Sequence, residues 1–134
     1  MPNRDLARLK SSPLAVVAAV AVFYLLFTLV ALALHGWDPL WFAWLGERYA
    51  DLDPGGRRGY DGQFVTYIAR DGLAAVPHLD NPAYRLQRIL LPALVRVLTG
   101  GNADLIAWAI PAVNLVAIIA ATAILAHWLR DQKV

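Results

Sequence analysis

Cysteine is absent from this chain of 134 residues, and charged residues are scarce. Without cysteine there is no disulfide framework, no thiolate zinc site and no cysteine nucleophile. Charged residues make up 16% of the sequence, against about 25% in a typical soluble domain. The hydrophobic fraction is 59% and the mean hydropathy is +0.49, so we expect lipid to surround part of the chain.

Two further patterns are missing. The net charge is only +2, and no basic block is interleaved with aromatic residues, so we expect no nucleic-acid partner. The three histidines, His35, His78 and His127, lack the helical spacing of metal ligands, so we expect no zinc site.

Two long apolar runs are present instead. Residues 13–34 carry no charge, and 22 residues of helix extend about 33 Å, which matches the roughly 30 Å of bilayer hydrocarbon. A second run covers residues 105–126, with Asn102 and Asp104 placed to cap its first turn and Pro111 placed to kink it. The sequence therefore predicts an all-α membrane protein with two transmembrane helices, at 13–35 and 103–128.

The first run favours a permanent anchor over a cleaved signal peptide. It is longer than the apolar region of a signal peptide, and bulky residues follow it instead of a small-residue cleavage site. Tryptophans lie just beyond both spans, as is typical of membrane interfaces, at Trp37, Trp41, Trp44 and Trp128.

Basic residues near the ends of the chain predict the orientation. Arg4, Arg8 and Lys10 precede the first span, and Arg130 and Lys133 follow the second. The positive-inside rule then places segments 1–12 and 129–134 in the cytoplasm and loop 36–102 outside. The loop itself carries seven arginines, but long loops are translocated largely regardless of charge.

The outer loop is predicted to form short interfacial helices separated by turns. We expect an amphipathic helix at 39–50, a turn at 51–56 that includes Asp51 and Asp53, and a helix at 62–70 that buries Phe64, Tyr67 and Ile68. A second turn is expected at 76–80, which contains His78 and Asp80.

The last helix of the loop is predicted to start at Asn81-Pro82, to break or bend at Pro92 and to end at Gly100. One face is apolar, and the other carries arginines. The apolar face consists of Leu86, Ile89, Leu90, Ala93, Leu94 and Val97; the opposite face consists of Arg85, Arg88, Pro92 and Arg96. Because the run is short and rich in arginine, we expect it to be re-entrant or interfacial.

Asp61 lies between glycines and aromatics at the start of the predicted helix 62–70. A carboxylate at this position could act as a general base or bind a divalent cation. Alternatively, Asp61 caps the following helix, a common role for aspartate. The spacing alone favours the cap.

The arginine stripe of Arg85, Arg88 and Arg96 suggests a phosphate ligand, because guanidinium groups match phosphate oxygens. The phosphate could belong to a lipid-linked substrate or to ordinary phospholipid headgroups. The sequence pattern does not separate the two.

Three sequence blocks together resemble the N-terminal part of a known class of protein. They are LGERYAD at 45–51, GYDGQF at 59–64 with YIA at 67–69, and LDNPAYRLQRILLP at 79–92. They resemble bacterial multi-spanning membrane proteins of cell-surface glycopolymer formation, which are similar to the GT-C class of glycosyltransferases. The resemblance extends from the first span through the second.

The resemblance implies an inverting transfer of sugar from a polyprenyl-phosphate carrier on the outer face of the bacterial inner membrane. Asp61 would be the catalytic base or a ligand of a divalent cation such as Mg²⁺ or Mn²⁺. Arg85 and Arg88 would bind the carrier phosphate. Supporting roles would fall to Tyr60, Gln63, Tyr84 and Gln87. Proteins of this class have many more spans, so further helices of a longer chain or of a partner would complete the site.

A second hypothesis is a non-catalytic membrane subunit. Asn114 and small residues such as Ala117 and Ala121 could pack against a helix of a larger membrane protein. A scaffold that binds the lipid carrier is a third hypothesis. It uses the arginines but does not need Asp61.

Overall fold

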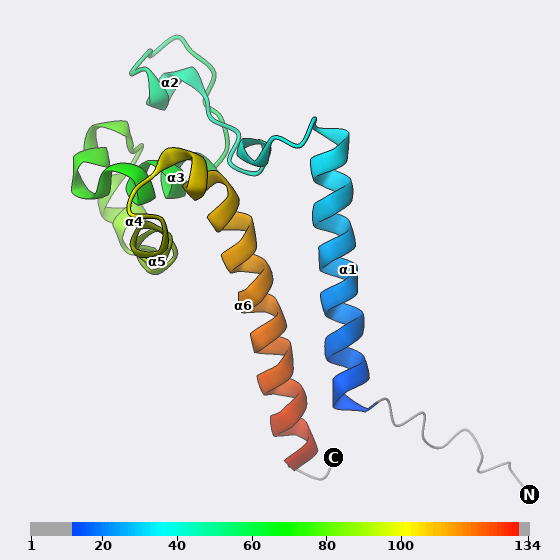
Figure 1. Ribbon diagram of the computed structural model, residues 1–134. Coiled ribbons are helices and arrows are strands. Elements are labelled where there is room, and N and C mark those ends of the chain that lie inside the picture. Colours follow the sequence, from blue (N-terminus) through cyan, green and yellow to red (C-terminus); the bar gives the residue numbers. More distant parts are fainter. Residues whose placement is uncertain (1–11, 132–134) are drawn as a thin grey trace, which may run out of the picture. The chain divides into compact units, whose positions relative to one another are not determined.

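The computed structural model describes residues 12–131, and every element in this range is helical. This confirms the predicted all-α fold (Figure 1). Arg4, Arg8, Lys10 and Lys133, on which the predicted orientation depends, lie outside the described residues. The elements are α1 (Pro13–Leu34), η2 (Pro39–Phe42), α2 (Glu47–Ala50), α3 (Gly62–Asp71), η3 (Gly72–His78), α4 (Pro82–Leu86), α5 (Leu90–Thr99) and α6 (Ala103–Asp131).

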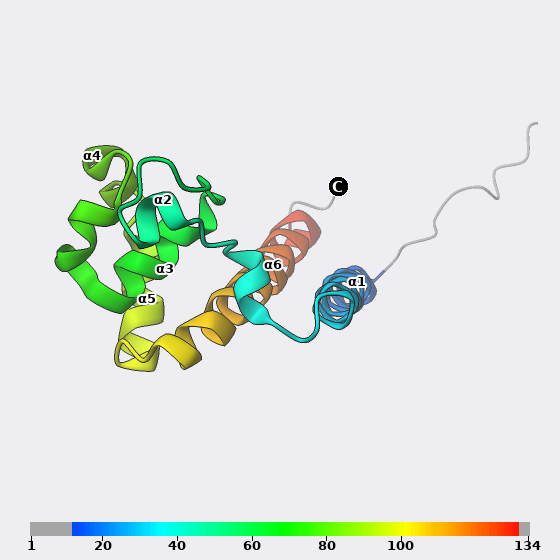
Figure 2. The same cartoon turned by 90° about the horizontal axis from the view of Figure 1, so that it is seen from above.

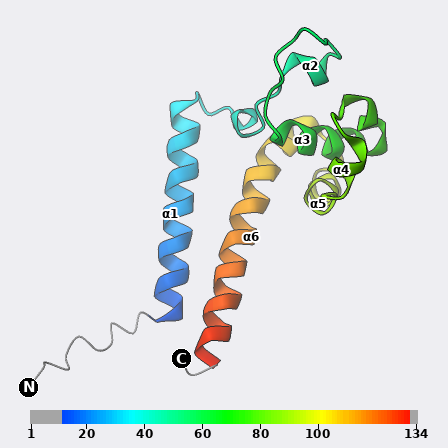
Figure 3. The same ribbon diagram turned by 180° about the vertical axis from the view of Figure 1, so that it is seen from behind.

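The two long helices, α1 and α6, coincide with the two apolar runs (Figure 3). Both are long and apolar enough to cross a membrane, as predicted. Their threonine hydroxyls are satisfied within the helix, because Thr28 donates to the carbonyl of Tyr24 at 2.8 Å and Thr122 to that of Ile118 at 2.7 Å. Hydroxyls bonded in this way can be tolerated in hydrocarbon.

The chain divides into two compact units. One consists of the described parts of Met1–Leu29 and Leu115–Val134, and the other is Val30–Asn114. The second unit contains loop 36–102 together with the end of α1 and the first part of α6. All the candidate site residues belong to this second unit.

Helix α3 lies at the centre of the second unit. Phe64, Tyr67 and Ile68 are buried on it, as their spacing predicts, and pack with Ala75 and Leu79 of the following segment. Helix α2 lies beside α3 (Figure 2). The rings of Tyr49 and Phe64 meet edge to face between them, at 5.2 Å. A second buried cluster joins three helices through Ala69 of α3, Val95 of α5 and Ile106 of α6.

The prediction of one continuous helix at 39–50 is wrong. The segment forms η2 and α2, separated by Trp44 with φ 39° and by Gly46 in extended conformation. A Cβ at Gly46 would lie 2.3 Å from the carbonyl oxygen of Arg57. The backbone of a distant residue therefore approaches Gly46, and this close contact breaks the helix.

The predicted turn at 76–80 is also partly wrong. The 3₁₀ helix η3 continues through Pro77 to His78. The Nδ1 atom of His78 lies 2.7 Å from the carbonyl oxygen of Tyr49, so this imidazole links η3 to α2. The turn at 51–56 has the predicted geometry, with Asp53 accepting a hydrogen bond from the Gly55 amide.

The helix predicted from Asn81 to Thr99 is interrupted, but not at Pro92. Asn81 caps α4 by accepting a hydrogen bond from the amide of Tyr84, as predicted. The chain then turns at residues 87–89, and Pro92 lies in the first turn of α5. Proline fits a first turn, because it has no partner carbonyl one turn earlier within the helix.

The two faces of α5 differ in what covers them. The side chains of Pro92 and Val95 are buried, whereas Leu90 and Val97 are 82% and 81% exposed. The predicted apolar face therefore points away from α3, and the face that carries the arginines packs toward it. An exposed apolar face is consistent with the predicted interfacial position of this helix.

Candidate functional site

An open cleft of about 240 Å³ lies between the start of α3 and the break between α4 and α5. Its charged lining residues are Asp61, Arg85 and Arg88. Its apolar lining comes from side chains of α3 and α5. The lining residues are Tyr60, Asp61, Gly62, Phe64, Val65, Ile68, Arg85, Arg88 and Pro92.

Arg85 links the acidic residues at and beside the cleft. Its guanidinium makes a two-pronged ion pair with Asp61, in which both N–O distances are 3.0 Å. It makes a second two-pronged pair with Asp80, in which both distances are 2.7 Å. Arg85 thus joins the start of α3 to the segment before α4, across 24 residues of sequence.

The aromatic surroundings of Arg85 strengthen this arrangement. The guanidinium carbon lies 4.1 Å from the centre of the Phe64 ring and 5.3 Å from that of Tyr84. The Arg85 side chain is only 11% exposed, so its charge is partly removed from water. Two carboxylates compensate this cost, which a single exposed ion pair would not do.

The charges of the cluster stabilise one another. Hydrogen bonds from Arg85 hold the pKa of Asp80 below its ordinary value. The pKa of Arg85 is raised, first by its bonds to Asp80 and then by those to Asp61. Asp80 is therefore the tighter of the two partners.

Asp61 does not cap α3 with its side chain, contrary to the role that its spacing alone favours. Its backbone is helical, with φ −55° and ψ −28°, and its carboxylate makes no bond to the first amides of the helix. An N-cap residue normally has extended backbone, which lets its side chain fold back. The Asp61 carboxylate is instead turned toward Arg85 and remains 62% exposed at the cleft.

Arg88 is the second cation of the cleft. One of its terminal nitrogens donates to the hydroxyl of Tyr84, and its guanidinium carbon lies 4.6 Å from the Tyr84 ring centre. Arg88 is exposed, and within residues 12–131 no carboxylate forms an ion pair with it. Tyr84 therefore orients Arg88 without neutralising it.

Gln63 has a different place from the other residues of its block. It is buried, and its amide oxygen accepts hydrogen bonds from the Gly46 amide and the Tyr67 hydroxyl, both at 3.2 Å. Its amide nitrogen donates to the carbonyl of Arg58 at 2.6 Å. Gln63 holds the 44–59 segment against α3 and does not line the cleft. Gln87 is exposed and also lies outside the cleft lining.

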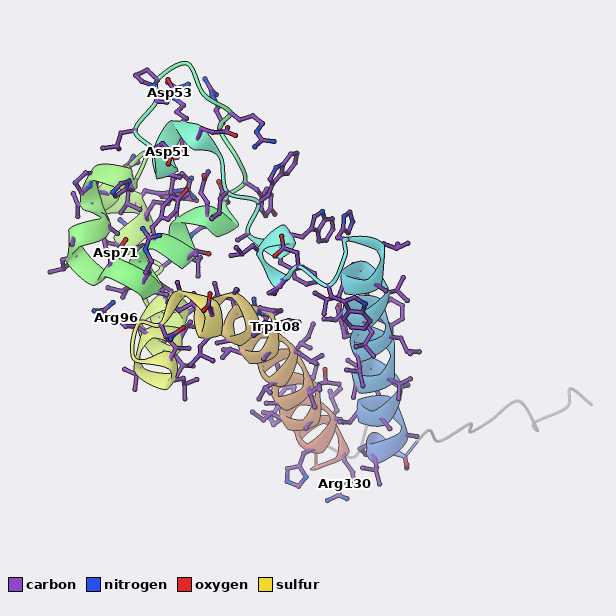
Figure 4. All side chains as sticks on the ribbon, turned by 45° about the horizontal axis from the view of Figure 1, so that its top comes forward. Asp51, Asp53, Asp71, Arg96, Trp108 and Arg130 are labelled. Carbon is purple, nitrogen blue, oxygen red and sulfur yellow. The ribbon has the colours of Figure 1, made fainter. Side chains whose placement is uncertain are left out.

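Arg96 is separated from the other members of the predicted arginine stripe. It donates to the carbonyls of Ala69 and Arg70 at the end of α3, which also carries Asp71 (Figure 4). These carbonyls have no partner within the helix, so Arg96 acts as a cap for α3. Only Arg85 and Arg88 remain at the cleft.

The described residues do not form a set of ligands for the predicted divalent cation. Within residues 12–131 no group of three or more acidic or histidine side chains is placed to hold a metal ion. Asp61 and Asp80 both contact the same guanidinium. A cation at Asp61 would have to draw its remaining ligands from water or substrate, and it stays a prediction.

Two members of the site were not predicted. Asp80 was interpreted as a turn residue, yet it is the closest partner of Arg85. Phe64 was assigned to the core, yet one face of its ring supports the guanidinium. The spacing of Asp80 and Arg85, five residues apart across a helix start, is the only local signal for their pairing.

Comparisons with known proteins identify no relative. No protein-family model matches the chain, and no curated protein or solved structure matches it. The functional argument therefore depends on the residues and geometry described above.

Proposed function

We propose that this chain is the N-terminal part of a membrane glycosyltransferase that uses a polyprenyl-phosphate-linked sugar to assemble a cell-surface glycopolymer. The observation that carries the proposal is the cleft, where an exposed carboxylate and two guanidiniums meet beside an apolar wall. An amphipathic substrate with a phosphate between a sugar and a hydrocarbon chain has matching chemistry.

Asp61 is suited to the role of general base. Its two carboxylate oxygens each accept one hydrogen bond from Arg85, and each has further lone-pair capacity. The carboxylate is 62% exposed, so an acceptor hydroxyl can reach it. Asp61 would take the hydroxyl proton as the oxygen attacks the anomeric carbon, and the bond from that carbon to the phosphate oxygen would break.

A guanidinium at the cleft is suited to stabilise the leaving group. Negative charge develops on the phosphate oxygen as the glycosidic bond breaks, and a nearby cation lowers the energy of that state. The apolar wall formed by Val65, Ile68 and Pro92 provides a surface for the start of the hydrocarbon chain. We propose that the cleft lies on the outer face of a bacterial inner membrane, with both termini in the cytoplasm.

One observation favours the alternative of a non-catalytic subunit or lipid-carrier scaffold. The apolar face of α5 is uncovered, and α6 exposes apolar side chains beyond its buried first turns, so both offer surface to helices of a partner. This alternative predicts stable co-purification with a larger membrane protein and no need for Asp61.

The test is Asp61→Asn in cells that carry no other copy of the protein. The change keeps the shape of the side chain and removes the base, so we expect glycopolymer to be lost while the protein level in the membrane stays normal. Asp53→Asn is the matched control, because Asp53 is an exposed aspartate of the same loop outside the cleft. Normal glycopolymer in the Asp61→Asn cells would refute the catalytic proposal and would favour the hypothesis of a non-catalytic subunit.

A further inference from the structure

The two arginines of the cleft differ in how many hydrogen-bond donors they have left. Arg85 donates four hydrogen bonds to Asp61 and Asp80, which leaves one N–H. Arg88 donates one hydrogen bond, to an uncharged hydroxyl, and keeps the rest of its donors. A phosphate that accepted two hydrogen bonds from Arg85 would have to displace a carboxylate, because only one N–H is left.

The charges around Arg85 and Arg88 also distinguish the two arginines. Arg85 is shared between two carboxylates, so an approaching anion meets net negative charge at that point. Arg88 has no acidic partner within residues 12–131 and is exposed at the cleft. An anion therefore gains more by approaching Arg88.

We propose that Arg88 is the phosphate-binding residue of this cleft and that Arg85 is a positioning residue, which holds the Asp61 carboxylate at the cleft instead of contacting the phosphate. The inference rests on the proposed function, since it assigns roles within the same site. It departs from the expectation that both arginines bind the phosphate.

The ligand chemistry is a phosphate ester on a hydrocarbon chain, a diester in the sugar donor and a monoester in the carrier that is released. The bilayer's own phospholipid headgroups are the competing source of phosphate. Farnesyl phosphate is a suitable probe, with farnesol as its uncharged counterpart. The full chain would be placed in nanodiscs of phosphatidylcholine and titrated with each compound. Parallel nanodiscs with about one third phosphatidylglycerol would supply an anionic headgroup.

The decisive variants are Arg88→Gln and Arg58→Gln. Both remove one positive charge from an exposed arginine, but Arg58 does not line the cleft. We expect Arg88→Gln to weaken farnesyl phosphate binding about tenfold or more, as is typical of a charge-assisted hydrogen bond. Arg58→Gln should change it by less than about twofold, and farnesol binding should not respond to either change.

Nuclear magnetic resonance of the arginine side chains tests the role of Arg85 without a substitution that could unfold the chain. The Nε–H of Arg85 donates to Asp80, so its resonance should stay in place during the titration, while that of Arg88 shifts until saturation.

A shifting Arg85 resonance, or unchanged affinity in Arg88→Gln, would overturn the inference but not the proposed function. If phosphatidylglycerol abolishes the Arg88 response, Arg88 is a headgroup contact and the inference fails. If farnesyl phosphate does not bind the unmodified protein, both fail.

Discussion

Replacing Gln63 by alanine is expected to release the 44–59 segment from α3. The substitution removes three hydrogen bonds, from the Gly46 amide, from the Tyr67 hydroxyl and to the carbonyl of Arg58. Gln63 is 1% exposed, so water does not replace these bonds without local opening. At about 1 kcal/mol for each bond, the free energy of unfolding should fall by about 3 kcal/mol.

Two of the three bonds, those of Gly46 and Arg58, hold the segment itself. Losing about 2 kcal/mol there raises the population of the open segment about 30-fold. Trypsin cleaves after arginine, and the segment contains Arg48, Arg57 and Arg58. Cleavage after Arg57 and Arg58 is the signal to follow, because these two lie next to the lost bond at the Arg58 carbonyl. In the regime where closing is faster than cleavage, the cleavage rate follows the open population and should rise by the same factor.

The assay is a time course of trypsin cleavage on the full chain in detergent micelles, with the fragments identified by mass spectrometry. Gln87→Ala is the matched control, because Gln87 is an exposed glutamine outside the cleft. Equal cleavage rates after Arg57 and Arg58 in the two variants would refute the structural role of Gln63. A faster rate confined to Gln63→Ala would support it.

Two further predictions concern stability. Gly46→Ala should lower the melting temperature sharply, because its Cβ would meet the Arg57 carbonyl oxygen at 2.3 Å, whereas Gly55→Ala, with its nearest contact at 3.5 Å, should be tolerated. The pKa of Asp80 is lowered in the folded state by Arg85, so its ion pair stabilises the protein above the unfolded pKa of about 3.9 and the contribution is lost as the pH falls through the folded pKa. The Asp80→Asn variant should therefore have a lower melting temperature than the unmodified chain at pH 6. Between pH 6 and pH 3 its free energy of unfolding should fall less than that of the unmodified chain. A pH dependence identical to that of the unmodified chain would contradict the ion pair.

Local sequence signals predicted the helix boundaries that depend on neighbouring residues. Asn81 and Pro82 start α4, and Asn102 accepts hydrogen bonds from the amides of Asp104 and Leu105 at the start of α6. Gly100 adopts the left-handed conformation that ends α5. In each case the residues that decide the geometry are adjacent in sequence.

The failed predictions have causes that are distant in sequence. The helix expected at 39–50 is broken because the backbone near Arg57 approaches Gly46, a contact that no periodicity contains. The arginine stripe separates for a similar reason, since Arg96 bonds to carbonyls of α3 that lie 26 and 27 residues earlier. Helical spacing gives the direction of a side chain but not the partner that it meets.

The sequence predicted most residues of the candidate site but not how they contact one another. Asp61 and Arg85 were both selected from sequence, but their direct ion pair was not, because 24 residues separate them. Asp61 was weighed as a cap for α3, and its helical backbone conformation rules out that side-chain geometry. The consequence is a carboxylate that is oriented by Arg85 and still open to the cleft.

The packed core of loop 36–102 extends into the first turn of the second long apolar helix, α6. Ile106, in the first turn of α6, is fully buried against Ala69 and Val95, which belong to α3 and α5. A chain cut at Gly101 would lose this side chain and expose both of its neighbours, at a cost of several kcal/mol by analogy with large core truncations. The cleft therefore depends for its shape on the first turn of α6, one of the two helices long and apolar enough to cross a membrane. A displacement of that turn along the helix axis would change the α3–α5 packing on which the cleft is built.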